Sequence, residues 1–570
     1  MTRSLHSACA LSLALLAGTL TACSTSSTTN PGQLAAQPTK ARLFDGLGNH
    51  TRKVTTSSPD AQRYFNQGLN WMYSFNHDEA IRSFEEAVRL DPGCAMAYWG
   101  IALCHGPHIN APVMTEDSTK AAWSALQKAK DAADNATPVE KALIDALASR
   151  YIDPASAKDG KLPLTFDERS TLDKAYAEAM SRVYDEHKDD ADVCTLYAES
   201  LMDLRPWDLY EVGTAAPRPE TPRVLEALEL ALKINPNHPG ACHYYIHAVE
   251  ASSTPEKASA VADRLRTLVP ASGHMVHMPS HIDVRTGKWA LAAEQNRKAN
   301  KVDDEYRKLS PKQGLYRLYM AHDDHFLAYA CMMLGRREEA LKAAADMVRK
   351  IPADFVKDMA PFVDAYTPIG SEVMVRFGMW DEILASPKPP EHLPITVALW
   401  HFARAAAHNA KGNTSLAREE QRTFRTHIKT IPQEAMMAQN PAHKVLEIAD
   451  HTLEGEILFR EGKTDDAVAS LKKAIAIEDT LRYIEPPDWV QPVRHSLGAV
   501  LLAADRPQDA EAVYREDLKI WPENGWALYG LSQSLKAQNK DTAEIDKRFK
   551  EAWKHADTKL HASCLCVPTK

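Results

Sequence analysis

The sequence predicts an all-α protein built as a helical-repeat solenoid with a concave groove. Three observations carry this prediction. The chain has 570 residues, too many for a single compact core, so several domains or one elongated repeat array are expected. Small and aromatic residues recur with a period of about 34 residues over most of the chain. Glycine is scarce, at 23 residues, and the phosphate-loop, dinucleotide-binding, metalloprotease and serine-hydrolase motifs do not occur.

Composition and charge narrow the class of protein. Hydrophobic residues make up 44% of the chain and charged residues 25%, which is ordinary for a folded soluble protein. The net charge is −9, with 67 basic and 76 acidic residues. This balance argues against a nucleic-acid partner, which favours a basic surplus. Beyond residue 22 no apolar run reaches the roughly 18 residues of a membrane-spanning helix.

Residues 1–22 have the pattern of an export signal, with a basic residue, a short apolar stretch and then small residues. The Leu-Thr-Ala-Cys segment that ends at Cys23 resembles the lipobox of bacterial lipoproteins. The resemblance implies a lipid anchor on Cys23 and, with Ser24 after it, a place in the cell envelope at the outer membrane, facing the periplasm. The alternative is an ordinary signal peptide cut elsewhere. Residues 23–59 are expected to form a flexible tether.

A tandem repeat organises the chain from residue 60 onward. The first unit starts at Ala61 and carries small, aromatic and proline residues in a fixed order: Tyr64, Gly68, Trp71, Ala80, Phe84, Ala87 and Pro92. This order resembles the tetratricopeptide repeat, a pair of amphipathic helices. Further units in register start at Ala95, Pro239, Gly273, Ala321, Ile448, Gln491 and Gly525. The resemblance implies stacked helix pairs around a concave groove, each burying its apolar face against its neighbours.

The repeat marks predict two blocks. The first spans residues 60–352 and contains a Pro-rich extended insertion at 204–222, and the second spans residues 398–555. An irregular region, 353–397, is expected to connect them. Residues 556–570 are expected to form a tail whose Cys564 and Cys566 act either as a soft metal-ligand pair or as a reactive dithiol. Cysteines inside the predicted helices are expected to be buried thiols.

Histidines cluster in the first block, where the stretch from His238 to His325 holds 8 of the 23 in the chain. In three successive repeat units they fall at positions 2, 5 and 9, and a glutamate falls at position 12. Because these positions are three or four residues apart, they share one helix face, the face that lines the groove in tetratricopeptide proteins. The residues on this face are His243, His247, Glu250, His277, His281, His322 and His325.

Other residues are candidates for the same groove. His105 and His108 flank the Gly and Pro residues that end a predicted helix, so His108 is expected in a loop. Arg205 and Trp207 begin the Pro-rich insertion, which is expected to cover the groove from one side, with Arg205 as an anion partner. For each of these four residues the alternative is a purely structural role. The segments 243–252 and 277–285 also resemble parts of secreted bacterial tetratricopeptide proteins, which supports the fold and export and implies no activity.

Three functional hypotheses stay open at this stage. The first is a lipid-anchored scaffold that binds an envelope protein or peptide in its groove, since helical-repeat grooves bind extended or helical segments. The second is a metal-binding protein or metalloenzyme that holds Zn, Cu or Fe with His243, His247, Glu250, His277 and His281, because imidazole suits these metals. As an enzyme it would need a base, for which Glu250 and Asp283 are candidates. The third is a groove that binds an anionic or aromatic ligand without metal.

Overall fold

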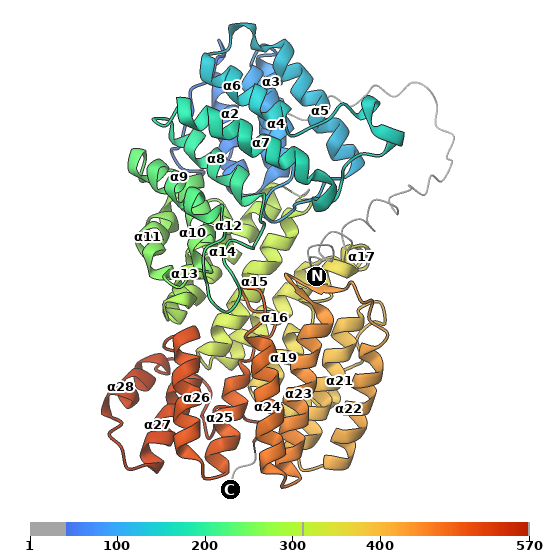
Figure 1. Cartoon of the computed structure of the whole chain (residues 1–570), viewed down its shortest axis with the longest axis vertical. Coiled ribbons are helices and arrows are strands. Elements are labelled where there is room, and N and C mark those ends of the chain that lie inside the picture. Colours follow the sequence, from blue (N-terminus) through green and yellow to red (C-terminus); the bar gives the residue numbers. More distant parts are fainter. Residues whose placement is uncertain (1–40, 311–312, 568–570) are drawn as a thin grey trace.

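The computed structural model describes residues 41–310 and 313–567, and within these residues the chain is almost entirely α-helical (Figure 1). The signal, Cys23 and residues 24–40 of the predicted tether lie outside the described residues. The prediction of a flexible tether is wrong for residues 41–58, which pack against the repeats and bury Leu47, Arg52 and Val54. The strands β1 (Met436–Met437) and β2 (Asn440–Pro441) form one short antiparallel pair. In the described part of the chain, no helix is both long and apolar enough to cross a membrane. The predicted all-α helical-repeat solenoid is confirmed.

Consecutive helices pair as antiparallel hairpins and stack along the chain. The first half contains α2 (Pro59–Tyr73), α3 (His77–Leu90), α4 (Ala95–Cys104), α5 (Glu116–Asp131), α6 (Pro138–Ala148), α7 (Phe166–Glu186), α8 (Ala191–Met202), α9 (Thr221–Ile234), α10 (Pro239–Glu250), α11 (Ser259–Leu268), α12 (Gly273–His277), α13 (Pro279–Arg285) and α14 (Trp289–Leu309). Short 3-10 turns lie at Ala133–Asn135, Pro154–Ser156, Lys158–Gly160 and Pro255–Ala258.

The second half continues the same architecture. Its helices are α15 (Tyr316–Met333), α16 (Arg337–Lys350), α17 (Ala353–Asp358), α18 (Ala360–Val363), α19 (Ile369–Arg376), α20 (Trp380–Ala385), α21 (Pro394–Ala410), α22 (Thr414–Ile428), α23 (Ala442–Arg460), α24 (Thr464–Glu478), α25 (Val493–Ala503), α26 (Pro507–Ile520), α27 (Gly525–Ala537) and α28 (Ala543–Ala552).

Glycines at fixed repeat positions let neighbouring helices approach closely. The ring of Phe84 on α3 lies between Gly68 on α2 and Gly100 on α4, and a Cβ at these glycines would lie 2.6 and 2.7 Å from ring atoms. In the second half, the ring of Tyr514 on α26 lies in the same way against Gly498 and Gly530. The repeat marks in the sequence therefore report a packing arrangement, one large ring inserted between two glycine-bearing helices.

Residues 353–397 differ from the irregular connection that the sequence predicted, because they contain the short helices α17 to α20. Prolines stand at or next to the start of three of these helices, where a missing amide hydrogen costs no helical hydrogen bond. The apolar face of α19 then packs into the core: Ile369 and Val373 are fully buried in a cluster with α15 and α16. The prolines suggested an irregular chain, but they mark the starts of short helices.

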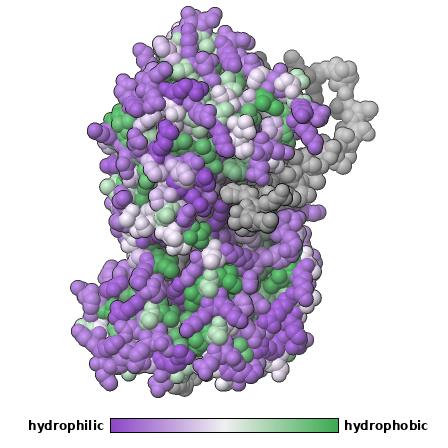
Figure 2. Space-filling view, in the orientation of Figure 1, coloured by the Kyte–Doolittle hydropathy of each residue, from purple (hydrophilic) through white to green (hydrophobic). Residues whose placement is uncertain are grey.

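The second half folds back onto the middle of the chain. The indole of Trp526 on α27 donates to the carbonyl of Met332 at 2.8 Å, and that of Trp289 on α14 donates to the carbonyl of Pro522 at 2.7 Å. The guanidinium of Arg376 lies 3.6 Å from the ring centroid of Trp526. These contacts fix α25 to α28 against α14 to α16, near the bottom left of Figure 1. The face in Figure 2 is mostly hydrophilic, interrupted by small hydrophobic patches.

The predicted C-terminal tail is part of the core of the second half. Cys564 and Cys566 are buried and joined by a disulfide, so they are neither a free dithiol nor open metal ligands in this structure. Ser563 donates to the carbonyl of His495 at 2.7 Å, which fixes the tail against α25. The cysteines at positions 104, 242 and 331 are free and buried, as predicted.

The burial of Glu456, on α23 beside this tail, predicts that the stability of the protein depends on pH. Burial raises its pKa from 4.5 to about 7, so the folded state holds a proton that the unfolded state releases. Stability contributed by this group is therefore complete below pH 4.5 and falls as the pH rises toward 7, by up to about 3 kcal/mol. Glu456→Gln, which mimics the protonated form, is expected to match the wild type in urea unfolding at pH 5 and exceed it at pH 8. The exposed Glu447→Gln is the matched control, and equal curves for all three proteins at pH 8 would contradict the prediction.

Candidate metal centre

Helix α10 positions the first group of candidate residues. His238 caps its N-terminus by accepting a hydrogen bond from the amide of Ala241 at 3.0 Å, and Pro239 follows as its first residue. Along the helix, His243, His247 and Glu250 are spaced by four and three residues, so they lie on one face. All three are buried, with 0, 7 and 1% of their surfaces exposed.

Three imidazoles form a first set. The Nε2 atoms of His243 and His247 are 3.1 Å apart, and Nε2 of His274 lies 3.1 Å from Nε2 of His243. His274 comes from α12, which begins next to Ser272, whose hydroxyl accepts from the amide of Met275. One ligand atom from each histidine lies within 4.8 Å of the other two, close enough to hold a single metal ion.

Three more imidazoles form a second set beside the first. Nε2 of His277 on α12 lies 2.8 Å from Nε2 of His281 on α13. His322 on α15 completes the set, with its ring centroid 4.7 Å from that of His277. The two sets are adjacent, because the rings of His274 and His277 are stacked with centroids 5.9 Å apart. Three successive repeat units therefore bring six histidines together.

The outward nitrogens of four of these histidines are held by oxygen atoms. Nδ1 of His243 lies 2.7 Å from the carbonyl of Tyr73, and Nδ1 of His277 lies 2.6 Å from Oδ1 of Asn296. Glu250 lies between the two sets: its oxygens are 2.9 Å from Nδ1 of His247 and 2.6 Å from Nδ1 of His281. Since these oxygens accept, each Nδ1 carries the hydrogen and each Nε2 presents a lone pair.

In each set, two Nε2 atoms face each other across about 3 Å, and a cation shared between them, either a proton or a metal ion, makes the contact favourable. A proton would place a positive charge in the core. Burial, and to a lesser extent the neighbouring His247, holds the pKa of His243 well below its usual range. Burial, and to a lesser extent the neighbouring His322, also holds the pKa of His277 well below its usual range. A metal ion held by several neutral imidazoles satisfies the geometry, and outward nitrogens bound to oxygens are the usual surroundings of metal-bound histidine.

The candidate residues from the sequence differ in how they relate to these sets. The sets contain five of the histidines predicted for the groove face, and Glu250 links them. Four of these histidines and Glu250 are buried and His322 is half-buried, so they do not form an open concave surface. His325 lies outside both sets, with its ring against Tyr366. Asp283 points elsewhere, since its carboxylate pairs with Arg266 at 2.6 Å, so its proposed role as a base has no support in this geometry.

The insertion and the loop after α4 cover the cluster. The ring of Trp207 lies edge-on to His247, with centroids 5.4 Å apart, and its indole donates to Oδ1 of Asn110 at 2.8 Å. Arg205 pairs with Glu220 within the insertion. His108 lies 4.4 Å from His77, ring to ring, and His105 is half-buried beside this pair without belonging to either set.

Three residues around the site escaped the sequence reasoning. His274 is one, although it stands at position 2 of its repeat, the position that His322 occupies in a later unit. Phe75 has φ of 57°, a strained conformation for a phenylalanine, and its ring centroid lies 4.5 Å from that of His243. Glu485, from the second half of the chain, places Oε2 3.6 Å from Nδ1 of His281. Of these three residues, only His274 occupies a repeat position that could have indicated its role.

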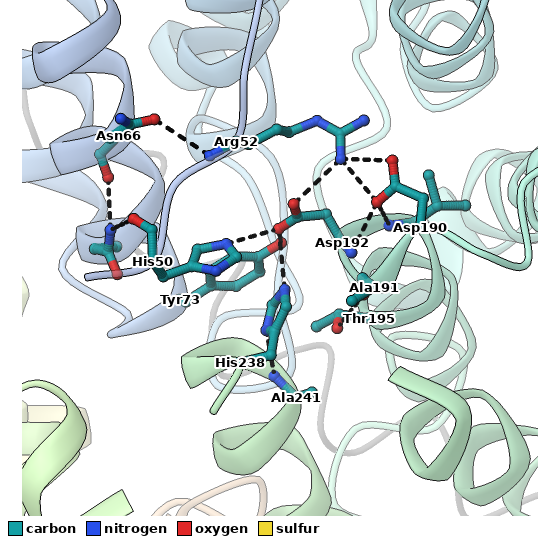
Figure 3. Close-up of polar contacts among 12 residues, drawn as sticks. His50, Arg52, Asn66, Tyr73, Asp190, Ala191, Asp192, Thr195, His238 and Ala241 are labelled. Carbon is teal, nitrogen blue, oxygen red and sulfur yellow. Dashed lines mark hydrogen bonds and ion pairs between the residues drawn. The ribbon is translucent and has the colours of Figure 1, made fainter. Parts of the chain in front are cut away.

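A second histidine cluster nearby is a hydrogen-bonded network centred on the carboxylate of Asp192 (Figure 3). His50, His238 and Tyr73 point toward Asp192, and their side chains donate to one carboxylate oxygen at 3.0, 3.0 and 2.7 Å. Both nitrogens of His238 have partners, because Nδ1 accepts from Ala241. The donors of this network meet an acceptor oxygen, whereas the Nε2 atoms of His243 and His247 face each other.

A cavity of about 520 Å³ lies beside the metal-ligand candidates. Its lining includes His247 and Glu250, residues of the insertion from Arg205 to Ala215, and the loop between α24 and α25. Volumes of this size are typical of small-molecule sites. The cavity therefore gives a small molecule a route to the edge of the histidine cluster.

Comparisons with known proteins find one matching repeat unit and distant structural likenesses. The tetratricopeptide repeat family model matches residues 61–94, the unit formed by α2 and α3. No curated protein matches the chain. Human IFIT1 with m7Gppp-AAAA is 13% identical, with 88% of this chain and 90% of that chain covered and a TM-score of 0.33. Yeast Tom70 is 11% identical, with coverages of 87% and 93% and a TM-score of 0.28.

The fold class is thus a tetratricopeptide-type helical-repeat solenoid. The family match covers one repeat unit, and likeness at these identities and TM-scores says nothing about a ligand of this chain. Helical repeats of this type suggest a protein-interaction scaffold.

Proposed function

We propose that this protein binds two transition-metal ions, one in each three-histidine set. The observation that carries the proposal is the orientation of the imidazoles: Nδ1 atoms are held by oxygens, and Nε2 atoms converge at 2.8 and 3.1 Å. Zn, Cu and Fe all suit imidazole ligands. Three protein ligands per ion leave a coordination position open for water or substrate, as in catalytic metal sites.

The residues around the sets would orient and tune the ligands. Glu250 joins the two sets through one carboxylate. Burial raises its pKa, but the neighbouring His281 and His247, which donate to both of its oxygens, outweigh burial and hold the pKa below the usual range. An ionised Glu250 offsets part of the charge that metal binding brings into the core. The site therefore contains ligands, orienting oxygens and a compensating charge before any ion enters.

The protein- and peptide-binding hypothesis applies to other surfaces. The fold suggests an interaction scaffold, but the histidine face predicted for the groove is buried by Phe75 and the 204–222 insertion. We infer that an envelope protein or peptide partner binds outside the cluster. Metal binding and partner binding are then separable properties of one chain.

Elemental analysis tests the metal proposal directly. The chain from Ser24 onward, purified without a histidine tag from a periplasmic preparation, is expected to contain about two equivalents of zinc, copper or iron per chain. Metal removed by a chelator should return on addition of the same metal. A protein that holds no metal after incubation with each of the three would contradict the proposal.

We further propose that Cys23 anchors the protein to the outer membrane through lipid chains, as the lipobox-like sequence implies. Cys23→Ala expressed in a bacterium is expected to move from the membrane fraction to the soluble fraction. Cys9→Ala, which changes a cysteine within the apolar stretch, is the control and should stay with the membrane. Equal membrane association of wild type and Cys23→Ala would contradict the anchor.

A further inference from the structure

We propose that the 520 Å³ cavity binds a small aromatic anion, such as an aryl carboxylate, with Arg285 as the partner of the anionic group. This inference names the class of ligand that reaches the histidine sets. It rests on the proposed function only in assuming that these sets hold metal ions.

Among the described residues, Arg285 is the cation lining this cavity that forms no ion pair, although Glu485 lies near enough to interact with it electrostatically. Within the described residues, other cations that line it are paired: Arg205 with Glu220, Arg494 with Asp479 and Lys519 with Glu516. The guanidinium of Arg285 donates to the carbonyl of Ser252 at 3.2 Å, and its Nε is buried without a hydrogen-bond partner. A buried guanidinium nitrogen without an acceptor favours an anionic ligand.

Arg285 also lies in line with the metal-ligand candidates. Arg285 follows His281 by four residues on α13, so the two share one face of that helix. The same cavity is lined by His247 and Glu250. A ligand whose anionic group pairs with Arg285 therefore extends its body toward the histidine sets.

The walls of the cavity favour an aromatic body. They include five large aromatic residues, namely Trp207, Tyr210, Tyr483, Trp489 and Trp521. The ring of Tyr483 already lies under the guanidinium of Arg285, with 5.3 Å between the ring centroid and Cζ. Rings stacked or placed edge-on against such walls gain more than aliphatic groups of the same area.

Calorimetric titration with benzoate tests the inference on the metal-loaded protein. Benzoate is expected to bind, and Arg285→Gln should weaken it by about tenfold to a hundredfold, the range for a lost charge-assisted hydrogen bond. Lys519→Gln removes a paired cation from the same cavity and is the matched control, expected to leave binding unchanged. Arg285→Lys keeps the charge and should retain part of the affinity. Circular dichroism checks that each variant is folded.

The ligand class is tested with two further probes. Cyclohexanecarboxylate is expected to bind more weakly than benzoate, and inorganic phosphate is expected not to compete at equal concentration. Equal binding of benzoate by Arg285→Gln and wild type would overturn the inference, as would equal affinity for the aliphatic acid or full competition by phosphate.

The metal-free protein separates the two proposals. A chain that holds metal but binds no benzoate would refute the inference and leave the metal proposal standing. A chain that holds no metal but binds benzoate through Arg285 would refute the metal proposal and support the cavity assignment.

Discussion

Replacing His243 and His247 together by alanine is expected to remove one of the two metal equivalents, from about two to about one per chain. The reason is that these residues supply two of the three nitrogens of the first set, whose Nε2 atoms lie 3.1 Å apart. The second set keeps all its ligands. His277→Ala with His281→Ala should remove the other equivalent, and the four changes together should leave none. Elemental analysis measures each variant.

A buried histidine outside the sets provides the matched control. His238→Ala changes a fully buried histidine at the start of the same helix, and its ring nitrogens bind Asp192 and an amide. This variant is expected to lose stability and to keep about two equivalents per folded chain. Far-UV circular dichroism should show nearly unchanged helix content in all variants. Unchanged metal content in the His243 and His247 double variant would eliminate the first set.

The repeat frame made the fold predictable because its marks are packing contacts. Gly68 and Phe84 fall at fixed positions since the ring fills the space that the glycine leaves. Residues 353–397 escaped the same reasoning, because short helices bounded by prolines resemble an irregular chain when only local sequence is considered. The burial of α19 depends on α15 and α16, and repeat spacing carries no information about that tertiary contact.

The site was predictable to the extent that it follows helix periodicity. Helix spacing placed His243, His247 and Glu250 on one face. The repeat frame placed His277 and His281 at the matching positions of the following unit. Their burial was not predictable, because the covering groups come from elsewhere: Phe75 follows α2, and Glu485 comes from the second half of the chain. The orienting oxygen of Tyr73 is a backbone atom, which no side-chain pattern reveals.

Asp192→Ala is expected to lower the free energy of unfolding by about 3–5 kcal/mol, the cost of removing one partner from a buried charged network. The carboxylate accepts from His50, His238 and Tyr73, and it also pairs with Arg52 at 3.2 Å, so its loss leaves several buried donors without an acceptor. Burial alone would raise the pKa of Asp192, but hydrogen bonds from His238 and His50 outweigh it and hold the pKa well below the usual range.

The sign of the pH dependence follows from that shift. A carboxylate whose pKa is depressed on folding contributes stability that is complete above its unfolded pKa, near 3.9, and is lost as the pH falls toward the folded pKa. The destabilisation by Asp192→Ala should therefore be full at pH 7 and shrink below about pH 4. Asp60→Ala is the control, since Asp60 forms an exposed ion pair with Arg63 and should cost less than about 1 kcal/mol. Urea unfolding at both pH values measures the difference, and equal costs for the two variants at pH 7 would show that the Asp192 network does not stabilise the fold.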